Sequence, residues 1–258
     1  MNANKAAASV ISKYKAVIHR EEVQGSATWT PPLTRRVDAD GNVEFLTIRV
    51  RMHVGDSERD FKAKYAGSLL TARQICESIA AKEDMSPVEA QMFGLWLVST
   101  DLELQLQPKV DVHQVVRSWP HLMLKYTHIP EAENPAHEVN NHYFLYRREA
   151  TLTINEERNL VGDRSLQFLY GQARWNYISG RYLGGFIDCV TLAAFQLQSA
   201  NGDFNPSKMM PGYLTSERLA IYVPAYLLTK TKIAEWEQRI YAVYQSLSGM
   251  DARSATQG

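Results

Sequence analysis

Apolar and polar residues alternate strictly along residues 47–54, TIRVRMHV. The apolar positions are Ile48, Val50, Met52 and Val54, and the polar positions between them are Thr47, Arg49, Arg51 and His53. A period of two is typical of a strand with one buried face. We interpret GDSERD (55–60) as a turn and residues 61–65 as a second alternating strand, so the pattern predicts a β-hairpin.

The pattern after this hairpin changes to a helix and then returns to strands. Thr71 is placed to cap the helix, because its side-chain oxygen can accept from a free amide of the first turn. The predicted order is helix, strand, strand, strand, at residues 71–82, 92–99, 102–107 and 122–126. This is the order of a ubiquitin-like β-grasp roll, which we expect over residues 43–130.

Helical periodicity dominates the second half of the chain. We expect an all-α bundle over residues 140–250, with helices at 163–182, 186–200, 214–224 and 233–247, and a disordered tail at 251–258. The helix at 186–200 is apolar almost all round, which predicts burial on every side. Gly202 would end it and Pro206 would prevent its continuation. The fold class is therefore α+β.

Composition excludes several classes of protein. Apolar residues make up 45% of the chain, which is enough for a core. Lys plus Arg and Asp plus Glu each number 28, so no overall charge draws the chain to nucleic acid. No apolar run reaches about 18 residues, so we expect neither a transmembrane segment nor, from the short AAASVIS stretch, a signal peptide.

Sequence motifs for catalysis are missing. The chain has no HExxH, GxSxG, GxxxxGK or GxGxxG pattern. Cys76 and Cys189 lie in apolar helical patterns, which favours inert, reduced thiols. His137 and His142 flank a linker without nearby cysteines, so a zinc site there is disfavoured. We expect no enzyme, no catalytic or metal-binding residue and no cofactor.

The first 42 residues read as a basic arm and a linker. Residues 1–20 hold four cations and no acid, with apolar residues at roughly helical spacing. This arm would be a cationic amphipathic helix for a membrane or partner, a targeting peptide, or a frayed or self-docked segment. The last alternative is favoured. Residues 25–42 are rich in Pro, Gly and Thr, as linkers are.

The hairpin carries the strongest candidate site. Its expected partner-binding residues are Arg49, Arg51, Lys62 and Lys64, which point away from the core, with Arg73 near the edge of the patch. Such a patch could bind an acidic protein surface or anionic lipid headgroups. The competing interpretation is a solvated strand face whose cations keep the edge from aggregating.

Several segments resemble FERM domains. The helical part does so through LAAFQLQSANGDFNP, YVPAYLL and AEWEQRIYAVYQSLSGM, and the first part through MFGLWLVSTDLELQLQPK and RSWPHLMLKYT. The segments LWLVS, LQLQPK and SWP are similar to the branch that holds the Krev-interaction-trapped scaffold and the FERM protein that escorts inactive rhomboids. The resemblance covers roughly residues 43–250 and implies a ubiquitin-like lobe followed by an acyl-CoA-binding-like helical bundle.

The resemblance also implies a function. It predicts a cytoplasmic, non-enzymatic adaptor or scaffold at the plasma membrane or cell cortex that binds a Rap- or Ras-type small GTPase or a membrane-protein tail. Ubiquitin-like lobes often meet acidic GTPase surfaces by pairing an exposed edge strand. The alternative is a module for anionic phospholipid or an acyl-type small ligand. A FERM domain normally has a third, phosphotyrosine-binding-like lobe, and we expect that lobe to be absent here.

Overall fold

The computed structural model describes residues 31–67, 69–127, 141–159 and 162–257. The chain divides into two compact units, the first ending at Gln172 and the second beginning at Ala173. We call them the sheet unit and the helical unit and describe each by itself. Residues 1–20, which we interpret as a basic arm, lie outside the described residues.

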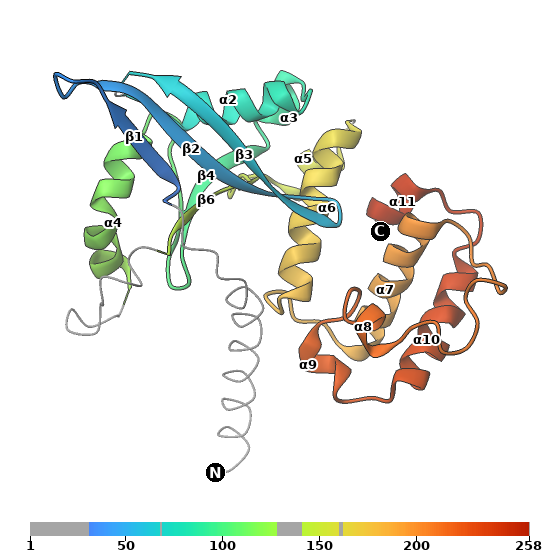
Figure 1. Cartoon of the computed structure of the whole chain (residues 1–258). Coiled ribbons are helices and arrows are strands. Elements are labelled where there is room, and N and C mark those ends of the chain that lie inside the picture. Colours follow the sequence, from blue (N-terminus) through green and yellow to red (C-terminus); the bar gives the residue numbers. More distant parts are fainter. Residues whose placement is uncertain (1–30, 68, 128–140, 160–161, 258) are drawn as a thin grey trace, which may run out of the picture. The chain divides into compact units, whose positions relative to one another are not determined.

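The sheet unit is built on one mixed sheet (Figure 1). Its strands are β1 (Leu33–Val37), β2 (Val43–Val54), β3 (Ser57–Ala66), β4 (Phe93–Val98), β5 (Glu103–Gln105) and β6 (Tyr143–Arg148). The order is β1-β2-β6-β4-β5, and β3 pairs with β2. Strand β2 runs parallel to β6 and antiparallel to β1 and β3. Strand β3 pairs with β2 along residues 45–54 and so occupies one side of β2. Strands β1 and β6 therefore share its other side.

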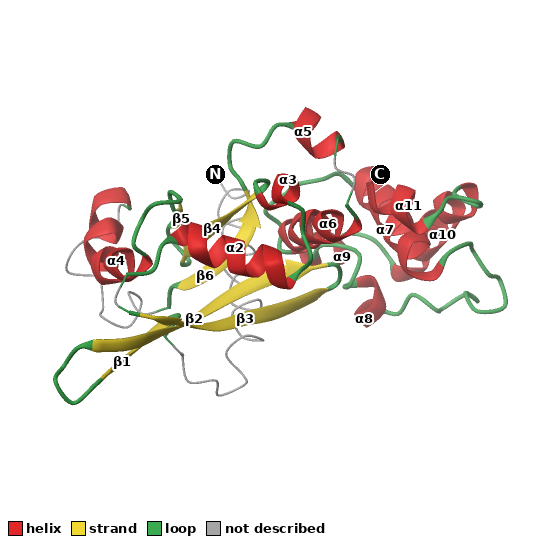
Figure 2. Cartoon of the chain, turned by 90° about the horizontal axis from the view of Figure 1, so that it is seen from above, coloured by secondary structure: helices red, strands yellow, loops and turns green. Residues whose placement is uncertain are grey.

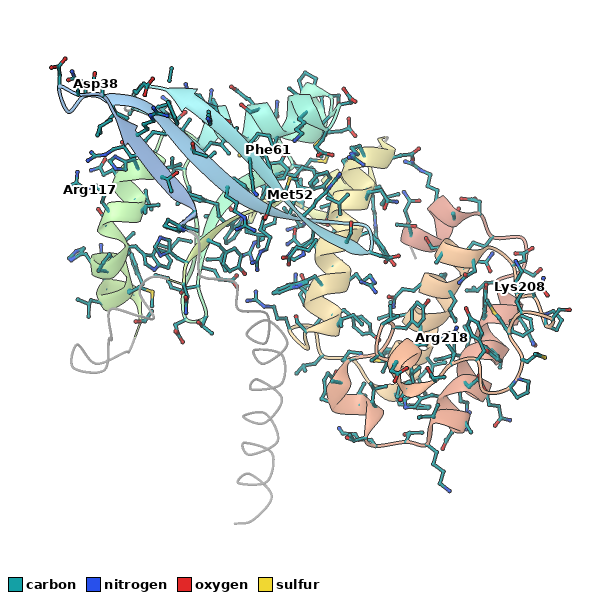
Figure 3. All side chains as sticks on the ribbon, in the orientation of Figure 1. Asp38, Met52, Phe61, Arg117, Lys208 and Arg218 are labelled. Atoms are coloured by element: carbon teal, nitrogen blue, oxygen red, sulfur yellow. The ribbon has the colours of Figure 1, made fainter. Side chains whose placement is uncertain are left out.

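The predicted hairpin and its buried face are confirmed. Ile48, Val50, Met52 and Val54 are all buried on one side of β2. Met52 and Phe61 come from the neighbouring strands β2 and β3 (Figure 3) and belong to one hydrophobic cluster. The loop is shorter than predicted, because only Gly55 and Asp56 separate the strands. The positive φ of Gly55, 57°, suits the first position of a tight hairpin turn.

Helix α2 (Ala72–Lys82) crosses the buried face of the sheet (Figure 2). Its Ile75 and Ile79 are fully buried in the same cluster as Ile48 and Val50. Thr71 caps it as predicted, and Gln74 completes a capping box with Thr71. The short helix α3 (Pro87–Ala90) follows, with Ser86 as its cap.

The strand predicted at 122–126 is wrong, because these residues end helix α4 (Val112–Tyr126). Asp111 caps this helix by accepting from the amide of His113 at 3.1 Å. Trp119 and Met123 lie four residues apart and are both buried, which is helical spacing. Pro120 lies inside the helix.

The predicted boundaries also differ from the structure. Strand β1 lies in the segment that we interpreted as a linker, and β6 joins the sheet well after residue 130. The sheet needs β6 because it joins β2 to β4. Residues 252–257, which we expected to be disordered, form helix α11 (Ala252–Gln257). Its start is fixed by Asp251, which accepts from the amide of Ser254 at 2.9 Å.

The helices between β6 and the helical unit are α5 (Ile154–Arg158) and α6 (Asp163–Ile178), and α6 crosses the boundary between the units. The first half of α6 packs on the hairpin, where the amide of Gly55 donates to the carbonyl of Gln167 at 2.9 Å. Gly171 permits this approach, because a Cβ there would lie 2.8 Å from the Val54 amide nitrogen.

The helical unit is organised around α7 (Phe186–Asn201) and α10 (Ile233–Ser246). The segment 214–224, predicted as one helix, contains only α8 (Ser216–Leu219), and α9 (Ala225–Leu228) follows it. Helix α7 is not buried on every side. Cys189, Ala193 and Leu197 are fully buried, whereas Ile187 is 77% and Leu192 is 37% exposed.

The Gly-Asp-Phe segment after α7 has a structural role. Gly202 ends the helix with a φ of 72°, as predicted. The buried Gln198 donates to Asp203 at 2.9 Å and to the carbonyl of Met250 at 2.6 Å. Asp203 also accepts from the amide of Gly249 at 2.8 Å, and these hydrogen bonds lower its pKa. The segment therefore fastens the end of α7 to the end of α10.

Candidate binding face and sheet edge

The candidate site lies on the face of β2 and β3 that points away from the core. We call it the outer face and define it by Arg49 and Arg51 of β2 and by Glu58, Asp60, Lys62 and Lys64 of β3. The four cations predicted from the hairpin share this face. The structure adds two carboxylates, because GDSERD is mostly strand and places Glu58 and Asp60 beside the arginines.

Each arginine of the outer face pairs diagonally with one carboxylate. Arg49 lies directly opposite Lys62 in the ladder, but its Nε donates to Asp60 at 2.6 Å. Arg51 lies opposite Asp60, and its Nε is 3.1 Å from Glu58. The guanidinium of Arg51 also stacks on the ring of Tyr143, 4.2 Å from the ring centre. The arginines are therefore largely neutralised within the face.

The two lysines retain their charge on this face. Among the described residues, neither Lys62 nor Lys64 has an acidic partner within ion-pair distance. Lys64 lies 4.8 Å from the centre of the Phe45 ring, and Arg36 of β1 lies 5.6 Å from the same ring. Arg36 was missed because we interpreted its segment as a linker. The Nε of Arg36 lies 3.2 Å from the carboxylate of Glu44, so Arg36 is neutralised in the same way as Arg49 and Arg51. The positive end of the outer face is thus Lys62 and Lys64.

Arg73 is not brought to this face. It lies at the start of α2, and α2 packs on the buried side of the sheet. The sheet and its core therefore lie between Arg73 and the lysines.

Strand β3 is a sheet edge within the described chain, since β2 is its only partner there. The ladder shows which of its backbone groups face outward. A two-residue loop makes Val54 and Ser57 a hydrogen-bonded pair, and such pairs alternate along an antiparallel ladder. The amide of Gly67 donates to the carbonyl of Glu44, in agreement with this alternation. The amide of Arg49 donates to Pro32, away from β3. The backbone N–H and C=O groups of Asp60, Lys62 and Lys64 therefore point outward at the edge.

His53 lies on the same side of β2 as Arg49 and Arg51, but it is buried, with 5% of the residue exposed. Sequence alternation had placed it at the surface. Burial, followed by the positive charges of Arg51 and Arg147, lowers its pKa from 6.5 to about 4. Glu58 is 3.8 Å from its Nδ1 but does not offset these effects. His53 is therefore neutral at physiological pH.

The described residues offer little for catalysis. No group of three or more His, Cys, Asp or Glu side chains among them could hold a metal ion. Burial raises the pKa of the Cys76 thiol to about 12 and also raises that of Cys189, so neither thiol is activated. An open hollow of about 530 Å³ at the start of α4 is lined by polar side chains, which does not suit an acyl chain. None of the described helices is long and apolar enough to cross a membrane.

Comparison with known proteins gives a consistent result. Residues 155–258 match the family model of the FERM central domain. The chain is 29% identical over 163 residues to FERM domain-containing protein 8 of Xenopus laevis, covering 63% of this chain and 35% of that protein. The human protein of the same name is 26% identical over 185 residues, covering 72% and 37%. The chain thus spans about a third of the length of these relatives.

Solved structures show the same fold. The FERM and C-terminal domain complex of Drosophila Merlin aligns with a TM-score of 0.56 at 17% identity, covering 81% of this chain and 62% of that one. The MyTH4-FERM MF2 domain of Dictyostelium discoideum myosin VII aligns with a TM-score of 0.61 at 20% identity, covering 81% and 39%. The predicted α+β fold, a ubiquitin-like lobe followed by a helical lobe, is confirmed, and within it residues 155–258 match the FERM central domain.

Proposed function

We propose that this chain is a non-enzymatic adaptor module that binds a Rap- or Ras-type small GTPase, or the cytoplasmic tail of a membrane protein, at the cell cortex. We also propose that it is nearest to the FERM branch of the Krev-interaction-trapped scaffold. Its site in the cell would be the cytoplasm, at the inner side of the plasma membrane.

The observation that carries this proposal is that β3 is an edge strand and also carries two lysines with no acidic partner among the described residues. The outward N–H and C=O groups of Asp60, Lys62 and Lys64 can pair with an added strand, which supplies affinity independent of sequence. The side chains of Lys62 and Lys64 supply selectivity for an acidic partner. Arg49 and Arg51 contribute less than predicted, because Asp60 and Glu58 already neutralise them.

Calorimetric titration with a panel of Rap- and Ras-type GTPases tests the proposal. Each GTPase is loaded with GDP or with a non-hydrolysable GTP analogue. We expect binding only in the GTP-like state, and loss of at least about tenfold in affinity for Lys62→Glu/Lys64→Glu, because like charges then face the acidic partner. Arg73→Glu is the matched control, since it reverses a cation on the other side of the sheet.

Two results would contradict the GTPase proposal. One is the absence of binding to every member of the panel in either nucleotide state. The other is equal loss of affinity in Lys62→Glu/Lys64→Glu and Arg73→Glu, because a nonspecific charge effect would then explain the binding. Peptides from membrane-protein tails, titrated against the same variants, test the second partner class in the same way.

Anionic phospholipid is the second candidate, favoured by Lys62 and Lys64, which have no acidic partner among the described residues. Each cation near an anionic membrane is worth about 1 kcal/mol, so the two lysines would hold the chain weakly. Co-sedimentation with vesicles of phosphatidylserine and phosphatidylcholine measures this. Binding that rises with the phosphatidylserine fraction and falls in Lys62→Glu/Lys64→Glu supports it, and equal binding to pure phosphatidylcholine excludes it.

A further inference from the structure

We propose that β3 is also a self-association strand, on which two copies of this chain pair antiparallel about a two-fold axis at Phe61. The two sheets would then form one continuous sheet. This inference goes beyond binding of a GTPase, a tail or a lipid, and it needs none of them.

The first step is the backbone. In an isologous antiparallel pair with Phe61 opposite Phe61 of the second copy, Asp60 lies opposite Lys62 and Glu58 opposite Lys64. The outward backbone groups of β3 belong to its even-numbered residues, as the Gly67 and Arg49 hydrogen bonds show. The register therefore pairs outward groups with outward groups. Each such pair can exchange two hydrogen bonds.

The second step is charge. Reading along the outer face of β3, the side chains are Glu58, Asp60, Lys62 and Lys64, which is two acids followed by two bases. This order is self-complementary about Phe61, since every acid meets a base of the second copy. Opposite charges directly across an antiparallel pair stabilise it, and like charges destabilise it. The two lysines that lack an acidic partner within the described chain would gain one.

The third step is the size of the contact. Phe61 is buried in its own core, with 3% exposed, so it adds little apolar area to the interface. One strand against one strand buries less surface than a permanent dimer does. The association is therefore weak, concentration-dependent and sensitive to salt. It would also occlude the edge that the proposed partner needs, so self-association and partner binding would compete.

Sedimentation equilibrium of the full chain over a range of concentrations is the test, with no partner or lipid present. We expect reversible dimerisation that weakens with added salt. Lys62→Glu/Lys64→Glu makes the strand wholly acidic and should be monomeric. Glu58→Lys/Asp60→Lys makes it wholly basic and should also be monomeric, while an equimolar mixture of the two variants should form a heterodimer.

Two further variants keep the test independent of folding defects. Lys62→Pro removes an outward N–H without removing a ladder bond to β2, so it should abolish dimerisation with little change in circular dichroism. Arg73→Glu should dimerise like the wild type. A wild-type chain that stays monomeric at its highest soluble concentration overturns the proposal. So does a dimer that persists in both Lys62→Pro and Lys62→Glu/Lys64→Glu, because its interface would then lie elsewhere.

Discussion

Arg49 and Lys62 lie directly opposite each other across β2 and β3, and Arg49 avoids this like-charge contact by pairing with Asp60. The pairing leaves Lys62, like Lys64, as a cation at the sheet edge without an acidic partner among the described residues. The charge of the outer face is therefore decided by Asp60 as much as by the basic residues.

Asp60→Asn should destabilise the hairpin. The substitution keeps the shape of the side chain but leaves Arg49 opposite Lys62 without a compensating charge. We expect a loss of about 0.5–1 kcal/mol in the free energy of unfolding, because the pair is partly exposed and screened by solvent. Urea denaturation at low salt measures it. Asp60→Asn/Lys62→Gln should recover part of the loss, and no recovery would show that the like-charge contact is unimportant.

Gly171→Ala should destabilise the sheet unit, although alanine is normally the better residue inside a helix. The new Cβ would lie 2.8 Å from the carbonyl carbon of His53 and 2.9 Å from the amide nitrogen of Gly55. Backbone atoms cannot move aside cheaply, so we expect a cost of about 1–3 kcal/mol. Thermal unfolding measures it. Ala173→Gly on the same helix is the control and should cost only about 1 kcal/mol from helix propensity. A rise in melting temperature for Gly171→Ala would contradict the close approach.

The two faces of α7 should respond differently to truncation. Leu197 is fully buried, so Leu197→Ala should cost about 2–5 kcal/mol through lost burial and a cavity. Leu192 is 37% exposed, and Leu192→Ala should cost less than about 1 kcal/mol. Calorimetric melting of the two variants compares them directly. Equal destabilisation by the two substitutions would contradict this difference and would indicate that the helix is buried on every side.

Periodicity predicted the parts of this fold that depend on local pattern. The alternation over 47–54 and the cap at Thr71 are confirmed, because each is encoded within a few residues. The end of the helix at 112–126 was predicted as a strand, although the buried Trp119 and Met123 follow helical spacing. Strand β6 was missed because its pairing with β2 and β4 is non-local, and the local sequence around β6 does not indicate this pairing.

The candidate site was predictable only in part. Alternation placed Arg49, Arg51, Lys62 and Lys64 on one face, and the structure agrees. It could not show that Asp60 and Glu58 neutralise the arginines, because that depends on the length of the turn and the register. It could not place Arg73 either, since the side of the sheet that α2 covers is a tertiary property.

Protonation of His53 should destabilise the sheet unit as the pH falls. Its pKa is about 4 in the folded chain and about 6.5 when unfolded, so between these values the unfolded state binds the extra proton. The stabilising neutral form is thus fully effective above about pH 6.5 and is lost as the pH approaches 4. At 1.36 kcal/mol per pKa unit, the full effect is at most about 3 kcal/mol.

His53→Gln isolates this effect from the carboxyl groups that titrate at lower pH. Urea denaturation from pH 7.5 to 4.5 measures the unfolding free energy of wild type and variant. As the pH falls, the wild type should lose stability relative to the variant. An NMR titration of the ring should give a midpoint far below 6.5, because Arg51 and Arg147 oppose a further positive charge. A midpoint near 6.5, or a difference that does not vary with pH, would show that burial does not hold His53 neutral.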